Sequence, residues 1–299
     1  RLRIAMRISD VEPSLAQSEA EKAVSAGVMT SNEDDAFFQC TVNSPHGMPL
    51  IASWDEFRMS ATMESVLKGY EDPRMEHFFS PSVADGAYRG LRNGYEPVDL
   101  AHPELHVDNL SSLGPQWSPV SVSSSLRWEI ILSPEAYFLM AEGALKGWNM
   151  GGTAEEFYNT GIEMSLRRWD IDDEAVISAY QQSANVPVAT HDAPDPVSTI
   201  PVKFDNSDDF IALEQIATQK WLALFPDGWE AWADLRRRDL PRMYPRMASD
   251  NADVGVDELM RRIQYLPFEY SVNDTAVQDA ISKLGGPDLG STRLWWDPE

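Results

Sequence analysis

Two pairs of amphipathic helices, each joined by a short turn, constrain the fold of this sequence more than any other feature. In the clearer pair, residues 208–239, apolar side chains recur every three or four positions until Pro226-Asp227-Gly228 interrupts the pattern. A second helix is expected to begin near Trp229 and to end before Pro241. These residues therefore predict a helical hairpin. The stripe expected to be buried in its first helix consists of Phe210, Leu213, Ile216, Ala217, Trp221 and Leu224.

Residues 133–170 predict a second hairpin of the same kind. Pro134 suits the first turn of a helix, and Gly151-Gly152 supplies the turn between the two helices. Thr153 and Glu156 have the spacing of a capping box at the start of the second helix. Small residues that face aromatic rings let two helices approach closely, as in tetratricopeptide-type pairs. We therefore predict a mainly α fold of tetratricopeptide-like helical hairpins, with large irregular loops and minor short strands.

Regular structure is expected to be sparser outside the hairpins. Proline, glycine, asparagine and aspartate punctuate residues 30–125, which predicts a loop-rich region. Residues 184–207 are rich in proline and have no helical period, so they predict a long surface connection. The remaining expected elements are helices at 1–9, 14–26, 55–68 and 274–284 and short strands at 126–130 and 262–265.

The charge of the chain excludes one large class of partners. There are 48 acidic and 24 basic residues, which gives a formal net charge of −24. Such a charge repels the phosphates of nucleic acids and the headgroups of anionic membranes. We therefore predict no binding to DNA or RNA. The sequence also lacks an apolar run of the roughly 18–20 residues that a membrane-spanning helix needs.

The sequence carries no motif for cysteine chemistry, cofactor binding or catalysis. Cys40 is the only cysteine, so it has no partner for an internal disulfide, and its apolar neighbours predict a small buried core residue. No phosphate loop or Gly-x-Ser-x-Gly motif occurs, and the glycines at 285–290 follow a helix where a dinucleotide turn would follow a strand. We therefore predict no cofactor and no catalytic residue.

Two polar segments superficially resemble metal sites. His102 and His106 are four residues apart, but Pro103 disfavours the helix that would align the two rings. The acidic residues 32–35 offer oxygen ligands without the spacing of a calcium-binding loop. We therefore predict solvated loops at both places and no metal site.

Aromatic side chains are the positive signal for ligand binding, since the chain contains ten tryptophans. An indole stacks on the apolar face of a sugar ring, while amides, carboxylates and guanidinium groups bind its hydroxyls. Helical spacing predicts that Trp148, Trp169, Trp221, Trp229 and Trp232 pack in the scaffold, and Trp295 and Trp296 are predicted to anchor the C-terminal tail.

The loop-rich region provides better candidates for a binding site. Its aromatic residues lie beside turn residues, where side chains can project into a shallow groove. Packing remains the alternative for each ring. The predicted ligand-binding residues are Trp54, Tyr88, Arg89, Tyr95 and Trp117, with Asn93 and Asp85 as hydroxyl partners.

Several segments, in the same order along nearly the whole chain, resemble the SusD/RagB family of nutrient-binding outer-membrane lipoproteins. Gln264 stands where the family usually has proline in one of these segments. The motifs that carry the resemblance are residues 54–60, 68–74, 148–152, 219–232, 261–267 and 292–297, which include the runs WDEFRMS, KWLALFPDGWEAW and TRLWWD.

The resemblance implies a non-catalytic protein at the cell surface that covers a TonB-dependent transporter barrel and captures glycans or other nutrients for import. It implies a single SusD-like domain over residues 1–299, with helical hairpins that contact the transporter and with ligand loops in residues 30–125. Family members carry a lipoprotein signal, an anchoring cysteine and a helical region before this point. We therefore expect that an N-terminal part of the natural protein is missing, and that the membrane is reached only through a lipid anchor outside this chain.

Two other functions remain open at this stage. A helical glycoside hydrolase requires two carboxylates that face one cleft, and an acidic chain offers many pairs. A helical adaptor that binds only protein requires no exposed aromatic surface for sugars. Exposed loop tryptophans would argue against the adaptor.

Overall fold

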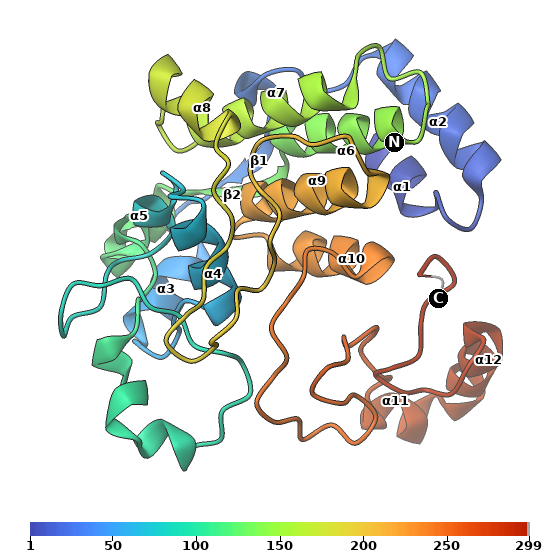
Figure 1. The fold of residues 1–299 in the computed structure, drawn as a ribbon. Coiled ribbons are helices and arrows are strands. Elements are labelled where there is room, and N and C mark those ends of the chain that lie inside the picture. Colours follow the sequence, from blue (N-terminus) through green and yellow to red (C-terminus); the bar gives the residue numbers. More distant parts are fainter. Residues whose placement is uncertain (298–299) are drawn as a thin grey trace.

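The computed structural model describes residues 1–297. The protein is built mainly of helices (Figure 1). No helix within this part of the chain combines the length and apolar character needed to cross a bilayer. The described helices are α1 Leu2–Arg7, α2 Pro13–Ala26, α3 Gly47–Ser53, α4 Ala61–Gly69, α5 Met75–Phe78, α6 Ser133–Leu145, α7 Ala154–Arg167, α8 Glu174–Gln181, α9 Asp209–Leu224, α10 Gly228–Arg238, α11 Pro267–Val272 and α12 Asp274–Leu284, and the strands are β1 Ala36–Gln39 and β2 Arg127–Ile131.

The hairpin predicted at residues 133–170 is confirmed as α6 and α7. The capping box is present, because the Thr153 hydroxyl accepts the Glu156 N–H at 3.2 Å and the Glu156 carboxylate accepts the Thr153 N–H at 2.8 Å. Gly161 lets the two helices approach closely, since a Cβ there would lie 2.9 Å from the ring of Phe138. Capping fixes where α7 begins, and the close approach allows α6 and α7 to pack more extensively than any other pair of described elements.

The hairpin predicted at residues 208–239 is confirmed as α9 and α10. Asp208 caps α9 by accepting the Phe210 N–H at 2.7 Å, and Asp227 caps α10 by accepting the Glu230 N–H at 3.1 Å. The second helix ends at Asp239, which adopts a left-handed conformation with φ of 53° just before Pro241. Turn and capping residues therefore place both helix ends where the sequence predicts them.

The predicted apolar stripe of α9 is only partly correct. Phe210 is 53% exposed, whereas Glu214, Gln219 and Lys220 are almost fully buried. The reason is the position of α9 between α6 and α10, which leaves little of the helix facing solvent (Figure 1). Buried charges require partners. Lys220 donates to Asp234 at 2.7 Å, and such contacts replace the water that these groups lose.

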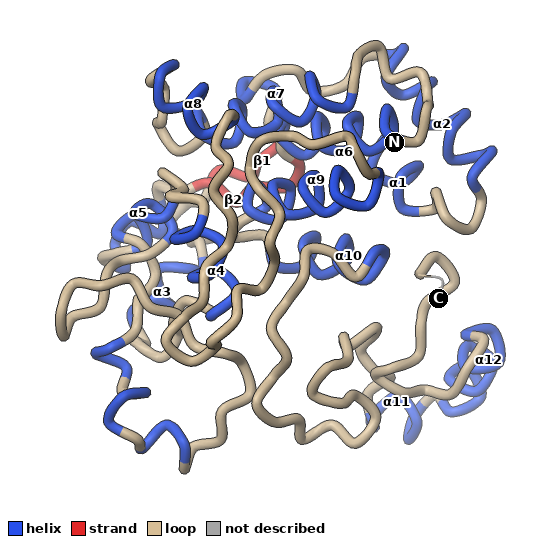
Figure 2. Tube along the Cα trace, viewed as in Figure 1, coloured by secondary structure: helices blue, strands red, loops and turns tan. Residues whose placement is uncertain are grey.

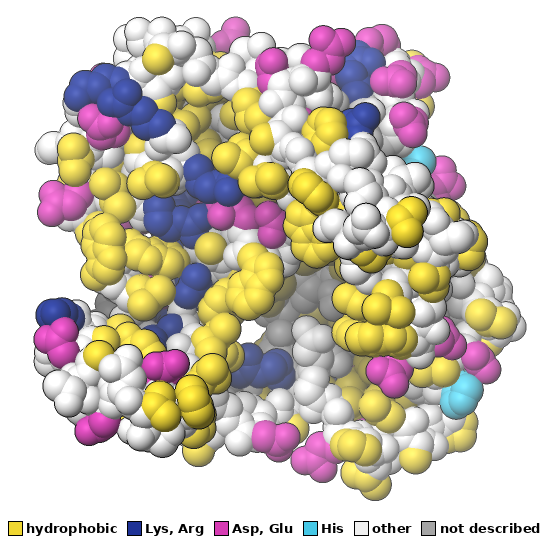
Figure 3. Space-filling model, turned by 180° about the vertical axis from the view of Figure 1, so that it is seen from behind, with side chains coloured by type: hydrophobic (Ala, Val, Ile, Leu, Met, Phe, Trp, Pro, Cys, Tyr) yellow, Lys and Arg dark blue, Asp and Glu magenta, His cyan; other side chains and the backbone are white. Residues whose placement is uncertain are grey.

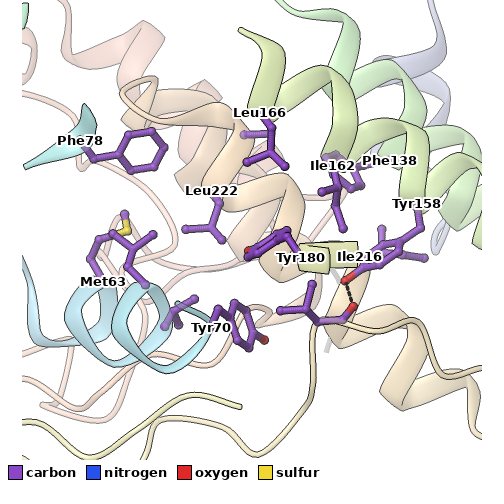
Figure 4. Close-up of a cluster of buried hydrophobic side chains, with 14 of the residues drawn as sticks. Met63, Tyr70, Phe78, Phe138, Tyr158, Ile162, Leu166, Tyr180, Ile216 and Leu222 are labelled. Atoms are coloured by element: carbon purple, nitrogen blue, oxygen red, sulfur yellow. Dashed lines mark hydrogen bonds between the residues drawn. The ribbon is translucent and has the colours of Figure 1, made fainter. Parts of the chain in front are cut away.

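The largest hydrophobic core joins α6, α7 and α9 of the two hairpins to α4, α5 and α8 (Figure 4). The connection at 184–207 has no helix, as predicted, but it does not simply cross the surface. Val202 and Phe204 are buried in this core, and the Tyr158 hydroxyl donates to the Val202 carbonyl at 2.7 Å. The Tyr70 hydroxyl binds the Ile200 carbonyl in the same way, at 3.2 Å. The segment therefore acts as a strap that ties α4 to α7.

Residues 30–125 form the loop-rich part of the described chain, as predicted (Figure 2). The strand expected at 126–130 is confirmed as β2, which pairs with β1 in antiparallel register, Phe38 opposite Trp128. The helix expected at 55–68 is wrong at its start. It begins at Ala61, because Ser60 caps it by accepting the Met63 N–H, while residues 54–60 are irregular.

The predictions for the other elements are partly confirmed. The helix pair near the N-terminus is confirmed as α1 and α2, and α12 ends at Gly285 with φ of 83°, as the sequence predicts. The strand expected at 262–265 is wrong, since these residues are irregular. Their hydrogen bonds go to other groups, for example from the Tyr265 N–H to the Asp288 carboxylate.

Candidate ligand-binding site

Trp54 lies at the end of α3, where the loop begins, and is 52% exposed. Its indole lies beside the ring of Phe57, which is 48% exposed, with the ring centroids 6.2 Å apart. Arg58 holds the loop by donating to the Val107 carbonyl at 3.1 Å and to the Asp55 carboxylate at 2.8 Å. The result is an accessible pair of aromatic rings on a constrained loop.

Tyr88 and Arg89 lie between α4 and the loop at 111. Tyr88 is partly buried against the large core, while the Arg89 N–H donates to the Ser111 hydroxyl at 3.0 Å. The Arg89 guanidinium donates to both oxygens of the Asp85 carboxylate. This hydrogen bonding is the main reason why the pKa of Asp85 is lowered. Asp85 therefore stays ionised, but part of its capacity to bind a sugar hydroxyl is already used by Arg89.

Tyr95 is tied to the strap at 184–207. Its hydroxyl donates to the Asp192 carboxylate at 3.3 Å, and the Arg92 N–H donates to the same carboxylate at 3.0 Å. Asn93 is exposed, and its carbonyl accepts the Met247 N–H at 2.8 Å. Tyr95 is thus fixed in place with its ring only partly accessible.

Trp117 corrects one expectation, because its side chain does not project from a loop. It is only 5% exposed, and it stacks on His46 with the centroids 5.9 Å apart and meets Trp169 edge-on at 6.4 Å. The preceding Gly114 lies so close to α5 that a Cβ would approach the His77 carbonyl oxygen to 2.2 Å. Trp117 is therefore packed among other aromatic rings and does not offer an open stacking face.

The predicted metal-like segments have other uses in the structure. His102 and His106 each accept a backbone N–H, from Glu104 and Asp108 respectively. Asp35 accepts the Ser133 N–H at 2.6 Å and so joins residues 32–35 to the start of α6. Among residues 1–297, no group of three or more histidine, cysteine or acidic side chains is arranged to hold a metal ion. Cys40 is 3% exposed, which confirms its predicted burial.

The tryptophans predicted to pack do so with one exception. Trp148, Trp169 and Trp221 lie against the two hydrophobic cores, and the Trp232 indole donates to the Met260 carbonyl at 2.8 Å. Trp229 is 70% exposed, so its predicted packing is wrong. It occupies the first turn of α10, where no other described element covers it.

The tail prediction is half correct. Trp296 is partly buried beneath Arg7 and Arg236, whose guanidinium carbons lie 5.1 and 4.9 Å from its ring centroid. Trp295 is 69% exposed and does not pack. The two tryptophans lie in a turn closed by the hydrogen bond from the Asp297 N–H to the Leu294 carbonyl at 2.8 Å, and only the Trp296 ring lies against the protein.

Sequence reasoning missed one aromatic surface. Trp128 of β2 is 50% exposed and lines a pocket together with Trp229. A signal was present, since the strand at 126–130 alternates between the two faces of a small sheet that has little to cover it. On the face seen in Figure 3, exposed hydrophobic side chains lie in groups bordered by charged ones.

Comparison with protein-family models matches residues 1–297 to the SusD-like family, described as SusD and RagB outer membrane lipoproteins. The chain belongs to this family. Membership places the protein at the cell surface, on the outer membrane. It also confirms the resemblance seen in the sequence. A comparison with curated proteins finds no match.

Solved SusD homologues have the same fold. A chitin-binding homologue from Flavobacterium johnsoniae is 38% identical with a TM-score of 0.89, over 100% of this chain and 62% of that one. Two proteins from Bacteroides thetaiotaomicron are 32% and 35% identical, with TM-scores of 0.88 and 0.84; each match covers 100% of this chain and 64% or 62% of the other. This SusD-like chain therefore spans less than two thirds of the length of these relatives.

Proposed function

We propose that this protein is a non-catalytic glycan-binding subunit of an outer-membrane uptake system. The observation that carries the proposal is the 38% identity, over the whole chain, to a SusD homologue described as chitin-binding. The exposed rings of Trp54 and Phe57 support it, because aromatic faces stack on sugar rings. In this proposal Trp54, Tyr88, Arg89 and Tyr95 contribute contacts from the loop-rich region, and Trp117 supports the rings around it.

Exposed tryptophans favour glycan binding over a purely protein-binding adaptor. Trp54, Trp128, Trp229 and Trp295 are each at least half exposed. A protein that binds sugars by stacking requires indole faces that are open to solvent. The mixture of exposed rings and charged groups suits ligands that have both apolar faces and hydroxyls.

Binding is to be measured by isothermal titration of the chain with soluble oligosaccharides of chitin, cellulose, starch and xylan, and with peptides. We expect heat of binding with at least one glycan. We also expect Trp54→Ala to weaken that binding, since it removes an accessible stacking surface. Absence of binding to every glycan in the panel would contradict the proposed function.

The hydrolase alternative has one structural feature in its favour. Asp35 and Glu129 line the same pocket, and burial raises the pKa of Asp35, as a general acid requires. However, Asp35 binds the Ser133 N–H and Glu129 pairs with Arg168 at 3.0 Å, so both carboxylates already stabilise contacts between neighbouring elements. We expect no release of reducing ends from any glycan. Release that disappears in Asp35→Asn would establish a hydrolase instead.

The proposed partner is a TonB-dependent transporter barrel, which the SusD/RagB family membership supports. A tagged form of the protein should retain a detergent-solubilised TonB-dependent barrel from its own organism, and the complex should survive gel filtration. Elution of the two proteins as separate peaks would contradict this part of the proposal while leaving glycan binding open.

A further inference from the structure

Two exposed indoles lie on one pocket beside the sheet. Trp128 is 50% exposed and Trp229 is 70% exposed, and they come from elements far apart in the sequence, β2 and α10. Exposed rings that share a recess are unusual for a scaffold, because large apolar surfaces are normally buried. The pocket is also lined by His46, Met48, Glu129, Arg168, Leu224, Pro226, Asp227 and Gly228.

Other aromatic side chains support both rings. The Trp128 ring lies against His46, with centroids 4.5 Å apart, and His46 in turn stacks on the buried Trp117. Trp229 meets Trp232 at 5.9 Å, and Trp232 is fixed by its hydrogen bond to the Met260 carbonyl. Rings held in this way lose little conformational freedom when a ligand binds.

An ion pair connects this pocket to a second one. Arg168 and Glu129 lie 3.0 Å apart and line both pockets. The Arg168 guanidinium also approaches the carbonyls of Ala223 and Phe225 at 3.3 and 3.5 Å, so its position is set by the end of α9. A carboxylate that accepts and a guanidinium that donates are the groups that bind sugar hydroxyls.

The second pocket, with a cavity of about 490 Å³, is lined by three residues whose buried donors are unsatisfied. The indole N–H groups of Trp117 and Trp169 and the amide of Gln116 are buried, and none of them has a hydrogen-bond partner among the described residues. Trp117 is more than nine-tenths buried. An unpaired buried donor is unfavourable. Because these donors are covered, a shift of the lining side chains that let them meet an acceptor oxygen of a ligand would relieve the cost.

We propose that these two pockets form one glycan subsite, which we call the aromatic groove. It binds a short neutral oligosaccharide by stacking on Trp128 and Trp229 and by hydrogen bonds to the Arg168–Glu129 pair. We expect a neutral ligand because the acidic and basic side chains around the groove nearly cancel in charge, and the net charge of −24 repels acidic sugars. The acidic ones are Asp35, Glu129, Asp170 and Asp227, and the basic ones are Arg127, Arg167 and Arg168. The inference rests on the proposed function and adds a site whose lining does not include Trp54.

The test compares Trp128→Ala and Trp229→Ala with Trp295→Ala, by titration with the oligosaccharide that the unmodified protein binds best. Trp295 is a matched control, since it is 69% exposed and lines neither pocket of the groove. We expect each groove variant to bind about tenfold more weakly, which corresponds to about 1.4 kcal/mol. Trp128→Phe should retain most of the affinity, and Trp295→Ala should retain all of it.

A second measurement uses the unmodified protein, so it does not require that any variant folds. A bound oligosaccharide should slow the oxidation of Trp128 and Trp229 by N-bromosuccinimide, but not that of Trp295, when the modified peptides are quantified by mass spectrometry. Unchanged affinity in both groove variants and equal oxidation of the three residues would overturn the groove and leave the proposed function standing. If the unmodified protein binds no glycan, both proposals fail. A protein partner that alone protects the two indoles would also refute the glycan subsite.

Discussion

Replacing the buried Arg74 with methionine should lower the free energy of unfolding by about 3–5 kcal/mol. Arg74 and Asp72 are fully buried, and the guanidinium binds both oxygens of the Asp72 carboxylate at 2.9 and 2.6 Å. It also donates to Ser165 of α7, Tyr180 of α8 and Gln219 of α9, at 2.8–3.0 Å. One side chain therefore connects the loop after α4 to three scaffold helices.

The magnitude follows from what the substitution leaves behind. Methionine fills similar space but donates no hydrogen bond, so the Asp72 carboxylate remains in the interior without its cation. The entropy of unfolding, about 2.1 cal/mol/K per residue, amounts to about 0.6 kcal/mol/K for 299 residues. The melting temperature should therefore fall by about 5–8 °C. Adding Asp72→Asn should recover part of the loss, because it removes the isolated charge.

Urea unfolding followed by circular dichroism measures the effect, with Arg167→Met as the matched control. Arg167 pairs with Glu163 and Glu174, but it is 25% exposed and its partners are more so. Exposed ion pairs contribute little, so the control should lose less than about 1 kcal/mol. If Arg74→Met costs no more than Arg167→Met, the argument that burial makes this network strong is wrong.

Two further predictions concern pH and close packing. Burial would raise the pKa of Glu142, but Arg237 outweighs it and lowers that pKa from 4.5 to about 2. The folded protein thus favours the ionised carboxylate, which contributes about 3 kcal/mol to the free energy of unfolding above pH 4.5. This contribution should be lost as the pH falls towards 2. Urea unfolding at several pH values should show the decrease in the unmodified protein and a much smaller decrease in Glu142→Gln. Gly69→Ala should cost about 1–3 kcal/mol in the same assay, because a Cβ would lie 2.3 Å from the Val186 carbonyl oxygen. Gly228→Ala, where a Cβ meets nothing within 4 Å, should change stability by less than about 0.5 kcal/mol.

The helical hairpins were predictable because their signals act over a few residues. Thr153 with Glu156, Asp208, and the Pro226–Gly228 turn determine where helices begin and end through hydrogen bonds to their own neighbours. The start of α4 was misplaced because contacts over long sequence distances hold the residues before it. Ser60 caps that helix, and the earlier residues are held by distant groups such as the Val107 carbonyl, which no local pattern reveals.

The candidate site was harder to predict, since exposure depends on the whole fold. Trp54 and Trp117 both follow or accompany turn residues in the loop-rich region, yet one is 52% exposed and the other 5%. What separates them is the contact of Gly114 with α5 and the rings of His46 and Trp169, which come from distant parts of the chain. Trp229 fits a helix pattern equally well, but no described element covers it.

Local chemistry was enough to specify the mainly helical fold, the two hairpins and the burial of Cys40, because periodicity and capping belong to short stretches of chain. Only the packed structure decided that Glu214 and Lys220 would be buried on a helix whose Phe210 faces solvent. It also decided that Trp128 and Trp229 would share a pocket. Burial is a property of what surrounds a residue, and those surroundings come from segments that the chain brings together only when it folds.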